Sequence, residues 1–183
     1  MCIRDRDGTS QGAHSIESNG AACDIAMNRV LVVTLLVLSA GCDTQELQLE
    51  FEAQAFAPPQ GFTRTTVTGE SISVDEDDWR TAPAYQTRIE IDPAFPNPPG
   101  NNPTVTVPIK VRGFNTVQGG LELVVFDADR QPRRLDDIRS ARDPGAYVFK
   151  FVPTLIGQSG LVRVFIVDPL GELVSYGDMQ LDD

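Results

Sequence analysis

Histidine is almost missing from this 183-residue chain, because His14 is the only one. Imidazole is the side chain whose ordinary pKa lies closest to neutral pH, and it is the commonest metal ligand among side chains. Residues 15–183 therefore cannot form a Ser-His-Asp triad, a histidine general base or a histidine-ligated zinc site. Carboxylates, hydroxyls, arginines and two lysines, Lys110 and Lys150, are what remains for chemistry there.

Cysteine is scarce as well. The chain has Cys2, Cys23 and Cys42, and none in residues 43–183. If the chain is processed so that Cys42 becomes its first residue, no intrachain disulfide can form, even in an oxidising compartment. The stability of the mature part must then come from packing of its core.

Long apolar runs are also missing. The run from Val30 to Ala40 has eleven residues, with only Thr34 and Ser39 polar. It is shorter than the roughly 20 residues that span a bilayer as a helix. Its length matches the roughly 7–15 apolar residues of a secretory signal peptide, and Arg29 precedes it as the basic residue. A buried strand or short helix is the alternative interpretation, because short apolar runs are ambiguous by periodicity alone.

The end of this run carries a family resemblance. Leu38-Ser39-Ala40-Gly41-Cys42 resembles the lipobox of bacterial lipoprotein signal peptides, whose cysteine receives a diacylglycerol and becomes the mature N-terminus. The usual leucine stands three residues before the cysteine, where this chain has Ser39, with Leu38 one place earlier. The resemblance implies export and lipid attachment through Cys42 to a bacterial membrane, on its periplasmic face or at the cell surface. Stable anchoring takes at least two acyl chains, and this modification supplies two or three.

These features divide the chain into four segments. Residues 1–26 are predicted to be a non-native or disordered extension, because Met1–Arg6 resembles a translated sequencing adapter and residues 1–29 carry a net charge of −1 where a signal peptide begins with positive charge. Met27 is then the expected start. Residues 27–41 are the signal peptide, 42–45 the lipidated anchor and a short tether, and 46–183 a single domain.

The charge of residues 43–183 is strongly negative. Twelve Lys and Arg stand against 22 Asp and Glu, a net charge of −10. A field of that sign repels nucleic acid and anionic lipid headgroups, which rules against both as default partners. The membrane contact is expected to come through the lipid, and the other partner is expected to be a protein or a polysaccharide that the sequence does not identify.

Alternating apolar residues, separated by turn residues, predict a series of short strands. They cover residues 43–56, 62–74 (one or two strands), 85–91, 105–111, 121–127, 147–152, 161–167 and 172–180. For 43–56 a helix is the less favoured alternative, because Glu, Gln, Leu and Ala are helix formers. Five prolines predict a long surface loop over 92–103, and Pro108 predicts an edge strand or a bulge. One helical turn is considered for 135–141. The fold is predicted to be all-β, an antiparallel β-sandwich of about seven to nine short strands, immunoglobulin-like or jelly-roll-like.

Two resemblances agree with this architecture. Residues 147–153 and 160–168 resemble the last strands of immunoglobulin-like and filamin-like modules. Residues 69–72, 77–79 and 121–129 resemble the bacterial pre-peptidase C-terminal domain, a β-sandwich appended to secreted proteins. Pro83 and the proline-rich loop depart from that second pattern. Neither resemblance implies an activity, because sandwich folds serve many functions.

Clustered carboxylates are the candidates for metal binding, since Ca²⁺ prefers several oxygen ligands at once. Asp75, Asp77 and Asp78 lie in the run Asp75–Asp78, which is either a Ca²⁺ loop or a solvated acidic turn. Asp127 and Asp129 follow a predicted strand and form a second candidate or a polar loop, with Asp136 or Asp137 as further ligands. Trp79 is either a sugar-stacking platform or a core residue.

Three functions follow from these features. The preferred one is a membrane-anchored envelope lipoprotein whose non-catalytic β-sandwich acts as a binding, adhesion or assembly module. The alternatives are a Ca²⁺-dependent carbohydrate-binding module and a hydrolase that uses paired carboxylates. No catalytic residue is predicted, and Cys42 is the expected lipidation site.

Overall fold

The computed structural model describes residues 44–117, 119–127 and 129–181. They form a helix over 44–55 and nine strands, which confirms the expected number of strands. The strands are β1 (Arg64–Thr65), β2 (Ser71–Ser73), β3 (Ile89–Ile91), β4 (Val105–Val111), β5 (Leu121–Phe126), β6 (Pro132–Ile138), β7 (Gly145–Phe151), β8 (Gly160–Val167) and β9 (Leu173–Leu181), with a 3-10 turn η1 (Pro153–Leu155). None of the helices in these residues has both the length and the apolar character needed to cross a bilayer.

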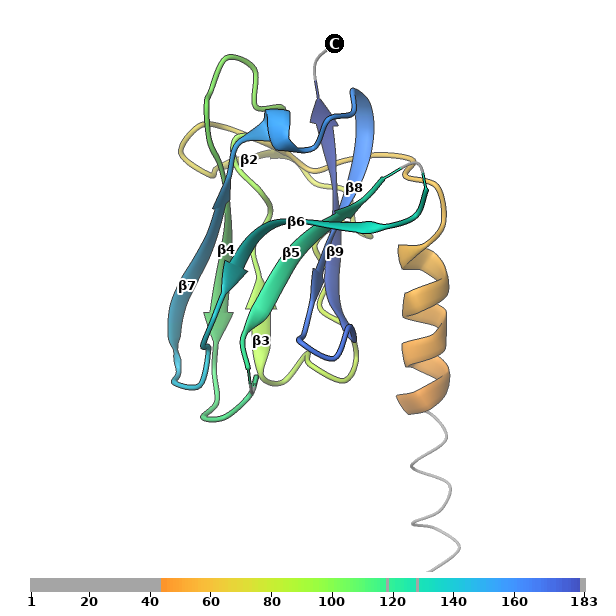
Figure 1. Ribbon diagram of the computed structural model, residues 1–183, viewed down its shortest axis with the longest axis vertical. Coiled ribbons are helices and arrows are strands. Elements are labelled where there is room, and N and C mark those ends of the chain that lie inside the picture. Colours follow the sequence, from red (N-terminus) through yellow and green to blue (C-terminus); the bar gives the residue numbers. More distant parts are fainter. Residues whose placement is uncertain (1–43, 118, 128, 182–183) are drawn as a thin grey trace, which may run out of the picture. The chain divides into compact units, whose positions relative to one another are not determined.

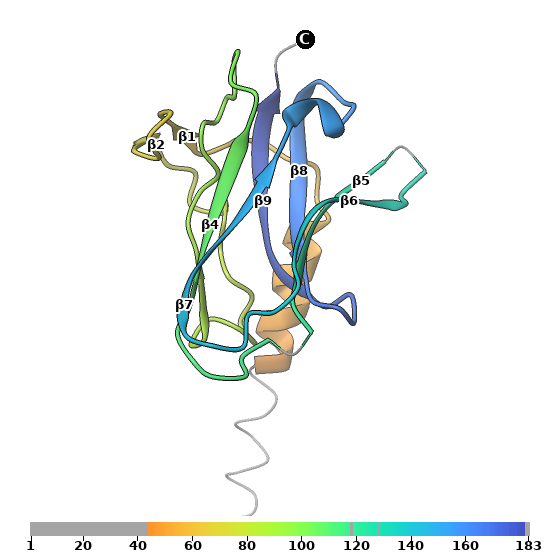
Figure 2. The same cartoon turned by 60° about the vertical axis from the view of Figure 1, so that its left-hand side comes forward.

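The strands form an antiparallel β-sandwich (Figure 1, Figure 2). One sheet has the order β3-β4-β7, the other has the order β6-β5-β8-β9, and β1 and β2 form a separate hairpin. All strand pairs are antiparallel. The predicted fold class is therefore confirmed.

The core lies between the two larger sheets, and the pattern of β4 shows why. Val105, Val107, Ile109 and Val111 are buried, while the residues between them are half-buried or exposed. Strands β8 and β9 are instead buried along most of their length, on both faces. Their second face is covered by the 44–55 helix, where Phe51 packs against Tyr176, while residues 79–82 bond through their backbone to the free edge of β9. This double coverage explains the nearly continuous apolar sequence of β8.

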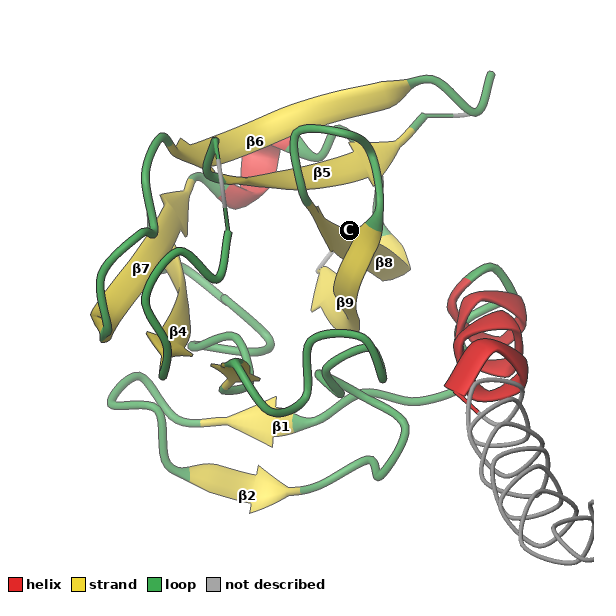
Figure 3. Ribbon diagram, turned by 90° about the horizontal axis from the view of Figure 1, so that it is seen from below, coloured by secondary structure: helices red, strands yellow, loops and turns green. Residues whose placement is uncertain are grey.

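The strand predicted over 43–56 is wrong, because residues 44–55 are helical (Figure 3). The alternating pattern is misleading: Leu47 and Leu49 are more than half exposed, while Phe51 and Ala55 are buried. Those two residues are four apart and share one helix face. Glu, Gln, Leu and Ala are also strong helix formers, and here this propensity outweighs a period of two.

Strand β4 is central, so the edge position predicted from Pro108 is wrong. The carbonyl of Pro108 accepts a bond from the Asp92 N–H, just beyond the end of β3 at Ile91. The backbone N and C=O of one residue in an antiparallel strand point toward the same neighbouring strand. The nitrogen of Pro108, which has no hydrogen to donate, therefore faces Asp92, where β3 has already ended. The ladder from β4 to β7 is complete across Pro108, which pairs with Val148.

Two further expectations need correction. Residues 132–138 form the edge strand β6 and not a helical turn; Leu135 is its one buried residue, and charged neighbours suit an exposed edge. The proline-rich loop 92–103 is irregular, as predicted, but it is not all at the surface. Ala94 and Asn97 in this loop are completely buried. The predicted hairpin of β8 and β9 is confirmed by their antiparallel pairing.

Candidate functional site

The sandwich has two ends with different chemistry. Figure 1 shows the connections β4–β5, β6–β7 and β8–β9, together with the residue-44 end of the helix, at what we call the lower end. The connection from β7 to β8, the loop 92–103 and the end of β9 lie at the upper end. The candidate sites follow this division.

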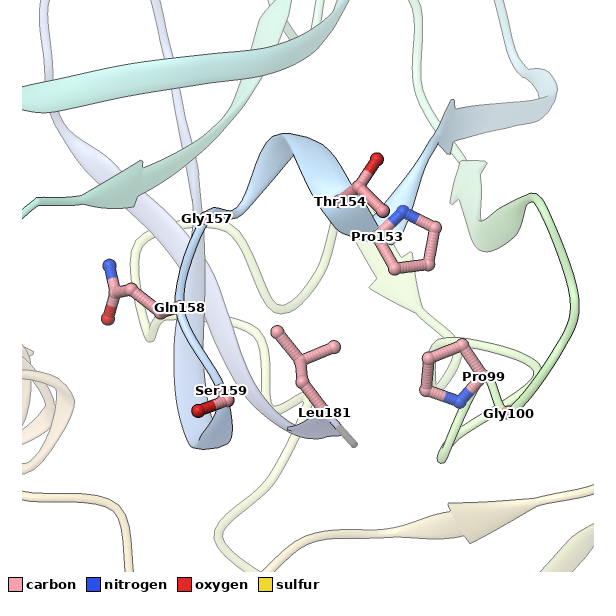
Figure 4. A pocket seen from close by; sticks show the side chains of 8 residues that line it. All are labelled: Pro99, Gly100, Pro153, Thr154, Gly157, Gln158, Ser159 and Leu181. Carbon is pink, nitrogen blue, oxygen red and sulfur yellow. The ribbon is translucent and has the colours of Figure 1, made fainter. Parts of the chain in front are cut away.

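A pocket of about 570 Å³ lies at the upper end (Figure 4). It is lined by Pro99, Gly100, Pro153, Thr154, Gly157, Gln158, Ser159 and Leu181. These residues come from the proline-rich loop, from η1 and the segment that follows it, and from the last residue of β9. None of them is charged. The pocket therefore presents apolar carbon beside a few hydroxyl and amide groups, which suits an uncharged ligand.

A buried charge hub lies below this pocket. Arg163 in β8 and Asp178 in β9 form an ion pair with two parallel bonds, Nε to Oδ1 at 2.7 Å and Nη2 to Oδ2 at 2.6 Å. Both side chains are less than a tenth exposed. Arg163 Nη1 also donates to the carbonyls of Gln54, Ala55 and Ala57. These carbonyls lie at or just beyond the end of the 44–55 helix, where carbonyls lack the usual helical partners, although that of Gln54 also accepts from the Ala57 N–H at 3.1 Å. Arg163 thereby attaches the helix to the sheet.

Asp78 belongs to the same hub. Its carboxylate accepts bonds from the backbone N–H of Thr63 and of Asp178. Burial raises the pKa of Asp78 to about 7, and the two N–H donors oppose this rise. Asp78 thus connects the chain before β1 to β9 and titrates near neutral pH.

Asn97 completes the hub from the proline-rich loop. Its Nδ2 donates to the carbonyls of Thr63 and Asp178, both at 2.9 Å, and its Oδ1 accepts from the Gln180 N–H at 3.1 Å. The amide side chain of Asn97 thus uses three of its four hydrogen-bonding positions. The hub consists of Arg163, Asp178, Asp78 and Asn97.

The structure separates the carboxylates that the sequence groups as Asp75–Asp78. Asp78 points into the hub, whereas Asp75 and Asp77 bond to each other, which raises the pKa of Asp75 and lowers that of Asp77. The backbone N–H of Asp75 also donates to Thr63 Oγ1 at 3.1 Å.

The second candidate pair has a local structural role. Asp127 Oδ1 accepts from the backbone N–H groups of Asp129 and Gln131, which closes the turn between β5 and β6. Asp136 accepts from the N–H of Lys150 and so bridges β6 and β7. Within residues 44–117, 119–127 and 129–181, no three His, Cys, Asp or Glu side chains are placed to hold a metal ion.

Trp79 is a core residue and not an exposed sugar platform, since only 4% of it is accessible. Its φ of 57° lies in the left-handed region, which is strained for a bulky side chain. The backbone N–H of Trp79 donates to the Tyr176 carbonyl at 2.9 Å. Its ring lies against Gly177, where a Cβ would overlap the indole.

A second hollow, of about 700 Å³, lies between the end of the helix and the outer face of β5 and β8. Phe56, Phe126 and Phe165 form an aromatic cluster in it, with ring centroids 5.0–6.1 Å apart. Phe56 is 65% exposed. Arg130 and Arg163 are the charged residues of its lining.

Sequence reasoning predicts no residue of the upper pocket and only one residue of the hub. It singles out Asp78 but misses Arg163, Asp178 and Asn97, because these residues are far apart in the sequence. Arg163 and Asp178 are 15 residues apart, and Asn97 and Asp178 are 81 residues apart. An arginine within the apolar strand Leu161–Val167 is the signal that could have revealed the hub. Cys42, the predicted lipidation site, lies outside the described residues.

Comparison with known proteins adds a local similarity to this all-β architecture. No family model matches the chain, and no solved structure matches it. Among curated proteins, "Protein ocs" from Agrobacterium vitis is 45% identical over 69 residues, which cover 35% of this chain and 19% of that protein. The chain thus spans about a fifth of the length of this relative, and the match does not show a family.

Proposed function

We propose that this chain is an exported envelope lipoprotein, anchored to a bacterial membrane through a lipid on Cys42, whose non-catalytic β-sandwich acts as a binding or assembly module. The observation that carries the proposal is the pattern Met27–Cys42: one basic residue, an uncharged apolar run of signal-peptide length, small residues and a cysteine. The folded domain follows this pattern almost at once, since residue 44 is already helical.

The position of the helix supports the proposed arrangement. Residues 44–55 run along the side of the sandwich from the lower end toward the hub (Figure 1). At 1.5 Å per residue, this helix is about 18 Å long. A lipid on Cys42 would hold the lower end near the membrane and direct the upper pocket away from it. The upper pocket is then the surface that an envelope partner can reach.

The lining of the upper pocket supports binding as its role. It has hydroxyl and amide groups on Thr154, Ser159 and Gln158 but no acid, base or nucleophile that a neighbour activates. Gln158 points away from the other side chains in Figure 4 and donates to the Phe126 carbonyl at 3.0 Å. A neutral polysaccharide or an uncharged protein segment suits this lining better than an ion does, and nucleic acid does not suit the acidic domain around it.

Lipidation is tested by Cys42→Ala in the full chain, expressed in a bacterium fed an alkyne-labelled fatty acid. We expect Cys42→Ala to abolish labelling and to release the protein from the membrane fraction. Cys23→Ala, which changes another cysteine of the same chain, is the matched control and should leave both unchanged. Membrane association that persists with Cys42→Ala would refute the anchor.

Binding at the upper pocket is tested by Ser159→Arg, which places a long charged side chain in the pocket. We expect it to reduce co-sedimentation of the protein with insoluble envelope polysaccharide at least tenfold. Thr68→Arg, in the turn between β1 and β2, is the control for added charge. Equal co-sedimentation of the two variants would exclude the pocket as the polysaccharide site.

A further inference from the structure

The two most exposed large apolar side chains of the domain lie in turns at the same end. Among the described residues, eleven large hydrophobic side chains are exposed, and the two most exposed are Leu170 at 86% and Phe114 at 75%. Leu170 lies in the turn between β8 and β9, and Phe114 lies in the connection from β4 to β5. Both connections are at the lower end (Figure 1, Figure 2). Single exposed apolar residues are common, but two at the tips of neighbouring turns form a surface with a distinct character.

The turns of the lower end are joined to one another. The Asn115 N–H donates to the Arg142 carbonyl at 2.6 Å, which joins the β4–β5 and β6–β7 connections. A Cβ on Gly119 would lie 3.0 Å from Pro169, so the β4–β5 connection also contacts the β8–β9 turn. Leu170 and Phe114 are therefore carried by adjoining turns of a single surface.

Local hydrogen bonds hold both tips in place. Asp168 Oδ1 accepts from the N–H groups of Leu170 and Glu172, each at 2.9 Å. Tyr85 fixes the other oxygen of Asp168 through its hydroxyl at 3.1 Å. Thr116 Oγ1 donates to the Gly113 carbonyl at 2.6 Å, which closes the turn at Phe114. Because the turns are already ordered, little conformational entropy is lost when their tips enter another phase.

The charge of this surface differs from that of the rest of the domain. This surface consists of the connections at the lower end and the first described turn of the helix. Together these segments contain four arginines and four acidic residues, so they are neutral. They are residues 44–47, 84–88, 112–120, 139–144 and 168–172. Residues 43–183 together carry −10, so the excess negative charge lies elsewhere. A neutral surface does not repel anionic headgroups, and Arg139, whose side chain is 92% exposed, can approach phosphates.

We propose that the lower end of the sandwich rests on the lipid bilayer, with Phe114 and Leu170 inserted at the headgroup level beside the lipid of Cys42. This inference rests on the proposed lipidation. Only Asp43 lies between Cys42 and Thr44, a span of about 7 Å at full extension, so the lower end cannot move far from the anchor. A short tether raises the local concentration of the bilayer at that end, so weak insertion of two side chains becomes effective.

The test places a fluorescent reporter at each tip. The lipidated full chain is reconstituted in vesicles of three parts phosphatidylcholine and one part phosphatidylglycerol, with or without bromine on the acyl chains. We expect Phe114→Trp and Leu170→Trp to lose about half of the fluorescence of the added indole in brominated vesicles. Trp79 is the only native tryptophan and is buried, so the unmodified protein gives the background.

The matched control is Leu155→Trp, because Leu155 is 51% exposed and lies in η1 at the upper end. Its added fluorescence should not change in brominated vesicles. Quenching at positions 114 and 170 no greater than at 155, in protein that floats with the vesicles, would overturn the membrane-facing end and leave the lipid anchor intact. Protein that does not float with the vesicles would overturn both proposals. A blue shift at 114 or 170 that depends on protein concentration without lipid would show instead that this end binds a second copy.

Discussion

The upper and lower ends of the sandwich are both made of connections between antiparallel strands, but they are held in different ways. At the upper end, segments far apart in the sequence meet in a buried hub of charged and amide side chains. At the lower end, backbone bonds and mostly short-range side-chain bonds close each turn, with Tyr85–Asp168 as a long-range bond, and apolar tips are exposed. The difference indicates that changes in the hub destabilise the fold more than changes at the lower end, which is free to vary its surface chemistry. Four predictions test this comparison, from the largest expected effect to the smallest.

Removing the central cation of the hub should be the most destabilising change. Arg163→Leu leaves the Asp178 carboxylate buried without its partner and removes the bonds that Arg163 donates to three carbonyls at the end of the helix. We expect a loss of about 3–5 kcal/mol in the free energy of unfolding, measured by urea denaturation. Arg134→Leu, which removes an exposed ion pair with Glu122, is the control and should cost about 0–1 kcal/mol. Similar losses for the two variants would contradict the role of the hub.

Truncating the amide of the hub should have the next largest effect. Asn97→Ala leaves two carbonyls and one N–H without the partners that Asn97 provides. The expected loss is about 2–3 kcal/mol, because each unsatisfied buried group is costly. Asn102→Ala removes one bond, to the Pro99 carbonyl, from an exposed residue of the same loop and should cost less than about 1 kcal/mol. Thermal unfolding of both variants in one buffer checks the difference.

The hub should also make stability depend on pH. The pKa of Asp78 is about 7 in the folded protein and near 3.8 when the chain is unfolded, so the folded state binds more protons between these values. The contribution of Asp78 is therefore fully present below about pH 4 and is lost as pH rises toward about 7. We expect a loss of about 2–3 kcal/mol between pH 5 and pH 8.

Asp78→Asn should flatten the pH dependence between pH 5 and pH 8. Residues 44–181 contain no histidine, so few other groups titrate in this range. Urea denaturation at pH 5, 6, 7 and 8 gives the slope for each protein. An equal slope in the variant would show that Asp78 is not its source.

Changes at the lower end should have the smallest effect on folding. Phe114→Ser and Leu170→Ser remove side chains that are 75% and 86% exposed. We expect the free energy of unfolding to change by no more than about 0.5 kcal/mol for each variant. A loss of several kcal/mol in lipid-free solution would mean that these tips support the fold, and the comparison between the two ends would fail.

The parts of the fold that the sequence predicts correctly are those determined by neighbouring residues. The hairpin of β8 and β9 follows from two apolar runs around Asp168-Pro169-Leu170-Gly171, and the buried strand β5 follows from Leu121–Phe126. The helix over 44–55 is missed because its residues satisfy two periods at once. Only the position of Tyr176 and Arg163, which contact the helix, decides between them.

The candidate site is harder to predict for the same reason. Asp78 is visible in the sequence as one of four adjacent acids, yet its difference from Asp75 and Asp77 arises from the Asp178 and Thr63 N–H groups that only the fold provides. The left-handed backbone of Trp79 has no local signal either. It depends on Gly177, almost a hundred residues later, leaving space for the indole ring.

The attachment of the helix by Arg163 has a consequence for the order of folding. Arg163 bonds to carbonyls 106–109 residues earlier in the chain, and its partner Asp178 lies in the last strand of the described domain. During synthesis from the N-terminus, the helix can form early, but it has no surface to dock on until β8 and β9 have paired. Phe51 and Ala55 stay exposed in every shorter chain, so the first and last elements complete the domain together. Contacts of such long sequence separation slow folding, which makes docking of the helix a late step.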